Sequence, residues 1–174
     1  SCLRDNALAR ALTALGEEAL LIPTYTPIRS DEESASIDRV FFGGLNVYLK
    51  QRWPFLRRMP RFVERLLDSP RLLNCLTYLA NSTDPTELGD LTISMLRGED
   101  GNQNEELETL VQWLQSDVKP DIVNLPNALF AGMAGRIKQH LNVPVVCTLT
   151  GEDIFLEGLA ADDRNTALEL ASEK

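Results

Sequence analysis

Two stretches in the second half of the chain decide the fold: PDIVNLPN at residues 120–127 and NVPVVCTLTGED at residues 142–153. Each contains a short apolar run bounded by Pro, Asn or Gly, which is typical of a buried β-strand. The segment between them contains Ala and Gly and predicts a helix over residues 128–141. A strand, a helix and a strand joined by short loops indicate parallel strands in a layered α/β domain. We expect those strands at residues 121–125 and 143–149.

The first part of the chain has a similar alternation of elements. Strong helix formers at residues 7–15 precede Gly16, a residue that commonly ends helices. Apolar runs at residues 19–22 and 39–42 predict two further strands. The expected helix carries Leu8, Leu12 and Leu15 on one face.

The middle of the chain predicts helices. Residues 53–97 have a helical pattern interrupted by prolines, including Asp84-Pro85, which places a capping residue before a proline at the first helical position. We interpret this region as a helical insert. A polar linker is expected at residues 98–104. A helix carrying Trp113 follows it, with a core-facing stripe at Leu107, Leu110, Val111 and Leu114.

Length and composition restrict the class of protein. The chain has 174 residues, of which 44% are apolar, so a single core can form. No apolar run approaches the roughly 20 residues that a membrane-spanning helix needs. The 3 cysteines include no C-x-x-C pair, which argues against a disulfide framework or a zinc site, and a reducing cytoplasm is the expected location. With 1 histidine, a His-rich metal site is excluded, and we expect no metal and no cofactor.

Charge is distributed unevenly. The net charge is −9, and the whole excess lies in residues 99–174, which have 5 basic and 14 acidic residues. An acidic chain repels phosphate backbones, so we expect no nucleic-acid partner. Basic and aromatic residues alternate between Lys50 and Arg71. This segment is either a solvated helix face or a weak contact with an anionic membrane surface. The contact would be made by Arg57, Arg58, Arg61 and Arg65.

Polar residues follow both strands of the second half. Ligands of parallel sheets bind beyond the carboxyl ends of the strands, so residues 124–127 and 148–153 are the candidate site. Glu152 and Asp153 could bind sugar hydroxyls or transfer a proton, or Thr150 or Asp153 could simply cap the next helix. Asn124 and Asn127 could bind a ligand or form the turn around Pro126. No glycine-rich phosphate loop occurs in the 174 residues.

These stretches resemble a known family. ALARALTALGEEALLIPT at residues 7–24 is similar to the LARALAARGHEVTVLTP segment of the acceptor-side domain of family 4 glycosyltransferases. Residues 120–127 and 142–153 resemble the family's PDVVHAHD and GIPVVVTLHGxD segments, in the same order and at similar spacing. The resemblance implies the GT-B fold, in which two Rossmann-like domains face each other.

The resemblance also implies what the chain does. Residues 1–174 would be a single, partial Rossmann-like N-terminal domain with a parallel sheet flanked by helices. The first strand and the C-terminal donor domain would lie outside these residues. The full-length enzyme would be a retaining glycosyltransferase that moves a sugar from a nucleotide sugar to the hydroxyl of a sugar or lipid-linked acceptor. The fragment would be inactive alone.

The resemblance carries over site residues one by one. Gly151 and Asp153 match the family pattern, whereas the family's histidines correspond to Asn124, Pro126 and Thr150, so no catalytic residue is assigned. The expected acceptor-binding residues are Arg4, Asn124, Asn127, Thr150, Gly151, Glu152 and Asp153.

Two other functions are open at this point. A dinucleotide-binding Rossmann enzyme would carry its G-x-G-x-x-G fingerprint before Ser1. A non-catalytic α/β binding module would need neither that fingerprint nor a donor domain.

Overall fold

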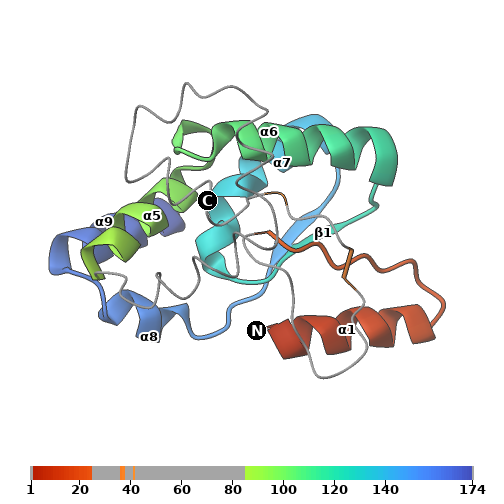
Figure 1. Cartoon of the computed structure of the whole chain (residues 1–174), viewed down its shortest axis with the longest axis horizontal. Helices are drawn as coiled ribbons and strands as arrows, with labels where there is room; N and C mark the ends of the chain where they lie inside the picture. Colours follow the sequence, from red (N-terminus) through yellow and green to blue (C-terminus); the bar gives the residue numbers. More distant parts are fainter. Residues whose placement is uncertain (1, 25–35, 38–40, 42–84, 174) are drawn as a thin grey trace, which may run out of the picture. The chain divides into compact units, whose positions relative to one another are not determined.

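The computed structural model describes residues 2–24, 36–37, 41 and 85–173 (Figure 1). The chain divides into two compact units, Ser1–Gly44 and Leu45–Lys174. The expected strand at 39–42, apart from Phe41, and the segment with Arg57, Arg58, Arg61 and Arg65 lie outside the described residues, as does most of the expected insert.

The first unit begins with helix α1, Cys2–Ala14, which starts earlier than the sequence predicts. The expected end at Gly16 is confirmed. Gly16 has a φ of +93°, its N–H donates to the Thr13 carbonyl at 3.0 Å, and the Glu17 N–H donates to the Leu12 carbonyl at 3.1 Å. These are the two hydrogen bonds of a Schellman motif, which favours glycine because of the left-handed φ. The three leucines expected on one face, Leu8, Leu12 and Leu15, are exposed, whereas Asn6 and Ala9 are buried.

The expected strand at 19–22 is present only as one bridge. Leu21 pairs in parallel with Ser36, and the Ile37 N–H donates to the Leu21 carbonyl at 3.1 Å. The chain at 19–22 is therefore extended locally without forming a longer strand among the described residues.

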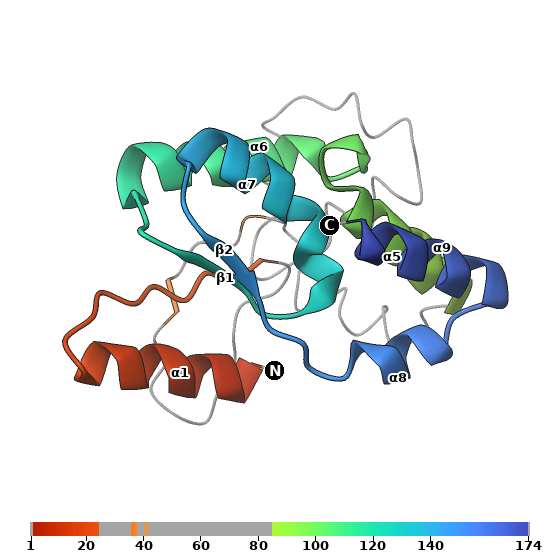
Figure 2. The same cartoon turned by 180° about the vertical axis from the view of Figure 1, so that it is seen from behind.

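The second unit contains a parallel strand pair, β1 (Val123–Leu125) and β2 (Val145–Cys147) (Figure 2). Val123 pairs with Val145, and Leu125 pairs with Cys147. The Thr148 N–H donates to the Leu125 carbonyl at 2.9 Å, which extends the ladder by one residue. Both strands are shorter than expected, but their parallel direction is confirmed.

The connection between the strands is helical, as predicted. It starts as a 3-10 helix, η5 (Ala128–Met133), and continues as α7 (Ala134–Leu141), which contacts β2. Asn142 ends α7 with a φ of 54°, a left-handed conformation that asparagine tolerates better than most residues.

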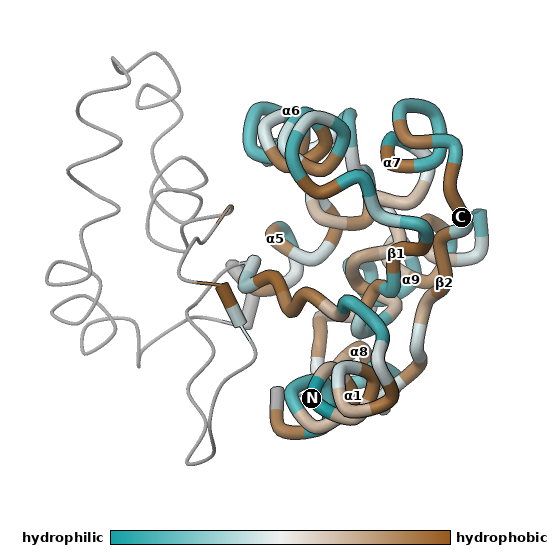
Figure 3. Tube along the Cα trace, turned by 90° about the vertical axis from the view of Figure 1, so that its right-hand side faces the viewer, coloured by the Kyte–Doolittle hydropathy of each residue, from teal (hydrophilic) through white to brown (hydrophobic). Residues whose placement is uncertain are grey.

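The predicted stripe before β1 lies in helix α6 (Asn104–Trp113) and in η4 (Leu114–Val118), a turn of π-helix. Leu107, Leu110, Val111 and Leu114 are buried, which confirms the stripe. Apolar and polar segments alternate around the turns of α6 in Figure 3. The helix ends at Lys119, as expected, with the Lys119 N–H donating to the Leu114 carbonyl at 2.7 Å.

The remaining helices are α5 (Pro85–Arg97), η3 (Gly98–Asp100), α8 (Glu152–Glu157) and α9 (Ala161–Ser172). The start of α5 at Pro85 is as predicted. α5 packs against α9 and η5, and Leu96 shares a buried cluster with Leu156, Leu159 and Ala167. The α5 part of the expected insert therefore belongs to the core.

The expected linker at 98–104 does connect α5 to α6, but part of it is buried, including Gly98 and Gln103. The Ser94 hydroxyl donates to Gln103 Oε1 at 2.7 Å, so side-chain hydrogen bonding fixes this connection. Gly98, with a φ of +62°, lies against Gly132 so closely that a Cβ on Gly98 would stand 2.0 Å from the Gly132 carbonyl oxygen. Two glycines thus let the end of α5 and η5 meet backbone to backbone.

The described part of the second unit is therefore largely helical, around a small parallel strand pair. No helix among residues 2–24 and 85–173 combines the length and the apolar character that crossing a membrane requires.

Candidate functional site

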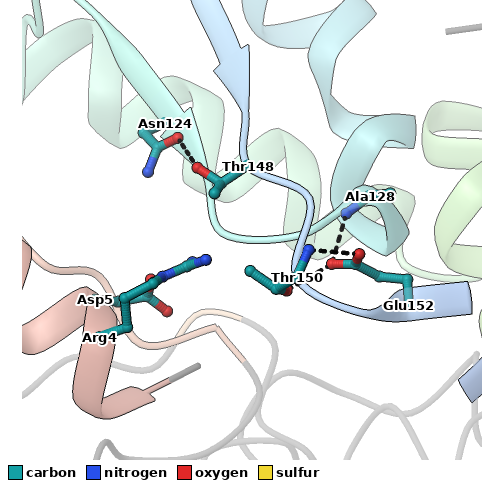
Figure 4. A network of polar contacts seen from close by, with 7 residues as sticks. All are labelled: Arg4, Asp5, Asn124, Ala128, Thr148, Thr150 and Glu152. Carbon is teal, nitrogen blue, oxygen red and sulfur yellow. Dashed lines mark hydrogen bonds and ion pairs between the residues drawn. The ribbon is translucent and has the colours of Figure 1, made fainter. Parts of the chain in front are cut away.

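The carboxyl ends of β1 and β2 place the two predicted polar stretches at one edge of the strand pair. The parallel register puts Asn124 opposite Val146, so residues 124–127 and residues 148–153 leave the strands on the same side. Figure 4 shows the polar contacts at this edge. The structure therefore brings together Asn124, Asn127, Thr150, Gly151, Glu152 and Asp153, as the sequence predicts.

Asn124 and Thr148 form a hydrogen-bonded pair across the two strands. The Thr148 hydroxyl donates to Asn124 Oδ1 at 3.0 Å (Figure 4). The hydroxyl proton is used in this bond, so the Thr148 oxygen can accept further hydrogen bonds while the Asn124 amide nitrogen can donate them. Thr148 lies in the predicted stretch 148–153 but is not among the expected acceptor-binding residues. Its signal is the two-residue period of strands, which puts Thr148 on the same side as Val146, the partner of Asn124.

Glu152 joins the loop after β2 to the loop after β1. Its Oε1 accepts from the Thr150 hydroxyl at 2.7 Å and from the Ala128 N–H at 3.3 Å, and its Oε2 accepts from the Thr150 N–H at 2.7 Å (Figure 4). The side chain is thus engaged with the protein's own donors.

Hydrogen bonding keeps Glu152 ionised. Partial burial, the largest single influence, raises the pKa of Glu152, but the donors from Thr150, from its own N–H and from Ala128 outweigh it, and the pKa is lowered. Glu152 is a stabilised carboxylate at neutral pH and a weaker base than an ordinary glutamate.

Gly151 and Asp153 flank this carboxylate. Gly151 occupies the N-cap position of α8 with a φ of 89°, and no side chain caps the helix. The alternative in which Thr150 or Asp153 caps this helix is therefore wrong. Asp153 is exposed, and its Oδ1 lies 3.9 Å from the position that a Cβ on Gly151 would occupy. The missing side chain at Gly151 leaves open space next to the Asp153 carboxylate.

Asn127 forms the turn that follows β1. Its side-chain oxygen accepts from the Leu129 N–H at 3.1 Å and caps η5, which favours the turn-forming role. Its amide nitrogen is not needed for the cap and can donate to a ligand.

Arg4 belongs to the first unit. Its Nε donates to the Asp5 carboxylate at 3.0 Å within α1 (Figure 4). Its membership of the acceptor site stays a prediction.

Cys147, at the end of β2, is a free and exposed thiol. Desolvation first, and the Glu152 carboxylate second, raise the pKa of Cys147. The thiol therefore stays protonated at neutral pH, which makes it a poor nucleophile.

The edge as a whole offers donors and acceptors in the pattern that hydroxyl groups use. The amides of Asn124 and Asn127 donate, and the oxygens of Thr148, Thr150 and Asp153 accept. Residues 121–127 and 145–153 include no Lys, Arg or His, so these segments lack the side-chain cations that would attract a phosphate. The chemistry suits a neutral polyhydroxyl ligand.

A hollow of about 340 Å³ lies elsewhere in the second unit. It is lined by α5 and the turn after it, including Asp90, Ser94, Arg97 and Asn102. The described residues contain no cluster of three or more His, Cys, Asp and Glu side chains arranged to hold a metal ion.

No protein-family model matches the chain, and comparisons with curated proteins and with solved structures found no significant match.

Proposed function

We propose that this chain is the acceptor-side domain of a retaining glycosyltransferase and binds an acceptor hydroxyl at the carboxyl edge of β1 and β2. The parallel pairing of the strands carries the proposal, because it brings two stretches that resemble family 4 glycosyltransferases to one polar edge. Glycosyl transfer requires the acceptor hydroxyl to be held against the anomeric carbon of the donor. An edge that presents hydrogen-bond donors and acceptors is suited to that task.

The acceptor is a sugar or a lipid-linked sugar, recognised through its hydroxyl groups. Each hydroxyl can accept from the Asn124 amide and donate to Thr148 or Thr150. Asp153 offers an exposed carboxylate oxygen to a further hydroxyl.

The donor is a nucleotide sugar held by a second domain outside the 174 residues. A leaving diphosphate needs positive charge or helix N-termini to stabilise it. The β1–β2 edge contains the starts of η5 and α8, but the Glu152 carboxylate accepts from the N–H groups of Ala128 and Thr150 there. Residues 121–127 and 145–153 also contain no Lys, Arg or His, which supports an acceptor wall here and a donor site elsewhere. The chain alone would then not catalyse transfer.

The proposal places the enzyme in the cytoplasm, with weak contact to the inner face of a membrane through Arg57, Arg58, Arg61 and Arg65. Such contact would bring a lipid-linked acceptor to the site.

The test is a transfer assay on the natural gene product that contains this chain, with a panel of nucleotide sugars and neutral acceptors. We expect donor hydrolysis and transfer, with a raised acceptor KM in Thr150→Val and Asp153→Asn. Asp121→Asn is the matched control, because Asp121 is an exposed carboxylate at the opposite, amino end of β1. Failure to bind or hydrolyse any nucleotide sugar would overturn the proposal, and binding of a dinucleotide would favour a dehydrogenase.

A further inference from the structure

The Glu152 side chain forms hydrogen bonds with both loops at this edge. It accepts from Ala128, which follows β1, and from Thr150, which follows β2. The two partners lie 24 and 2 residues away in the sequence. Because its carboxylate is ionised, these are charge-assisted hydrogen bonds, which are about twice as strong as neutral ones.

We propose that Glu152 is a positioning residue: it holds the loops after β1 and β2 in one arrangement, so that Thr150 and Asn127 face the same ligand. The hydrogen bonds exist independently of any ligand. The inference rests on the proposed function only for the identity of that ligand, the acceptor.

The chemistry of the contact explains why a glutamate is needed. All three partners are donors, and an ionised carboxylate presents only acceptors. A glutamine would bring an amide NH₂ against at least one donor. The Ala128 N–H is also one of the donors that the start of a helix leaves unsatisfied, and Asn127 satisfies the next one, at Leu129.

The same hydrogen bonds give the neighbouring carboxylates of Glu152 and Asp153 different roles. The oxygens of Glu152 are occupied by internal donors, so Glu152 is unsuited to receive a proton from the acceptor. Asp153 is exposed and is left as the carboxylate that contacts the ligand. By bonding the Thr150 proton, Glu152 also turns the Thr150 oxygen toward accepting rather than donating.

Amide NMR on this chain tests the internal contact. Wild-type Ala128 and Thr150 amide protons should titrate together, at a pH below the ordinary pKa of a glutamate. The other titratable groups near Glu152 are the Cys147 thiol and the adjacent Asp153. In Glu152→Gln the common titration should disappear, and hydrogen exchange at Ala128 should become roughly tenfold faster or more, as expected for loss of a charged hydrogen bond.

Glu157→Gln is the matched control, because Glu157 is an exposed glutamate at the other end of α8. It should leave both amides unchanged. Unaltered exchange and titration in folded Glu152→Gln would overturn the inference.

A second variant covers the case in which Glu152→Gln fails to fold. Ala128→Pro removes a donor from the opposite side of the contact, and proline is accepted at the first position of a helix. Asn127, the preceding residue, has a φ of −161° and a ψ of 165°, an extended conformation that a following proline allows. The Thr150 amide should then titrate at a higher pH, because Glu152 has lost one donor. An unchanged midpoint would contradict the inference.

The role of Glu152 in positioning the acceptor is tested in the complete transferase. Glu152→Gln should raise the acceptor KM, whereas the control Glu157→Gln should leave it unchanged. An unchanged acceptor KM, with the amide results as predicted, would overturn the positioning role. If wild-type enzyme shows no transfer at all, the proposed function fails, while the NMR result still decides whether Glu152 holds the loops.

Discussion

Gly132→Ala tests the packing that supports the candidate site. Gly132 lies in η5, the helix that begins at the site loop after β1. A Cβ at this position would stand 2.2 Å from the Met95 carbonyl oxygen and 2.6 Å from that of Leu96. Real Cβ atoms essentially never come closer than 3.0 Å, so the backbone of α5 or η5 would have to move by about 0.8 Å.

The expected cost follows from that displacement. Overpacking a well-packed interior costs about 1–3 kcal/mol. Replacing a helical glycine by alanine returns about 0.5–1 kcal/mol through backbone entropy. The net loss in the free energy of unfolding should therefore be about 0–2.5 kcal/mol.

The matched control is Gly135→Ala, three residues along in α7. A Cβ there would meet nothing within 4 Å, so only the favourable backbone effect of about 0.5–1 kcal/mol applies. The difference between the variants then isolates the packing cost, about 1–3 kcal/mol. Urea unfolding followed by far-ultraviolet circular dichroism measures both. If Gly132→Ala proves as stable as Gly135→Ala, the close approach of α5 and η5 is refuted.

Three other predictions concern the core, an ion pair and the basic segment. Leu107→Ala should lower the free energy of unfolding, measured with urea, by about 2–5 kcal/mol. Leu149→Ala should have little effect, because Leu149 is 75% exposed. Equal losses in the two variants would contradict the assigned core. The hydrogen bond from Arg136 is the main cause that lowers the pKa of Glu108 in the folded chain. The pair therefore stabilises the fold at pH values above 4.5, the ordinary pKa of glutamate, and this stabilisation is lost as the pH falls through the lower pKa of the folded state. Glu108→Gln should therefore lower stability at pH 7 and flatten its decline in acid, and an unaltered pH profile would argue against the pair. Sedimentation with anionic vesicles should show weak binding that salt reduces. This binding should be lost when four arginines are changed to glutamate: Arg57, Arg58, Arg61 and Arg65. Undiminished binding by that variant would refute the membrane contact.

Local signals in the sequence were sufficient to predict the strand pair and two helix ends. The apolar runs flanked by Pro, Asn and Gly predicted two parallel strands, because a short helical crossover between strands leaves few other arrangements. Gly16 and Lys119-Pro120 predicted two helix ends for similarly local reasons, the ease of left-handed backbone at glycine and the missing N–H of proline.

Contacts between distant segments could not be predicted in this way. Residues 98–104 look like a polar linker, but the close approach of Gly98 to Gly132 and the Ser94–Gln103 hydrogen bond bury part of them. The exposed leucines of α1 show the same limit, since periodicity identifies an apolar face without specifying a partner that covers it.

The sequence was sufficient to predict that the loops after β1 and β2 lie at one end of the strand pair, but not the hydrogen-bond partners of their side chains. The rule that ligands bind at the carboxyl ends of parallel strands identified the edge. The engagement of Glu152 by Ala128 depends on a pairing across 24 residues, which no local pattern reveals. The side chains of Asn127 and Glu152 form hydrogen bonds within the protein, whereas Asp153 is exposed.

Titration of the isotope-labelled chain with neutral saccharides tests the central claim most directly. We predict that the amide signals of Asn124, Thr148 and Thr150 shift in a saturable way with the saccharides, and that nucleotide sugars leave them unchanged. Saturable binding of a nucleotide sugar at this edge, or shifts from the saccharide confined to other parts of the chain, would contradict the claim that β1 and β2 form an acceptor wall.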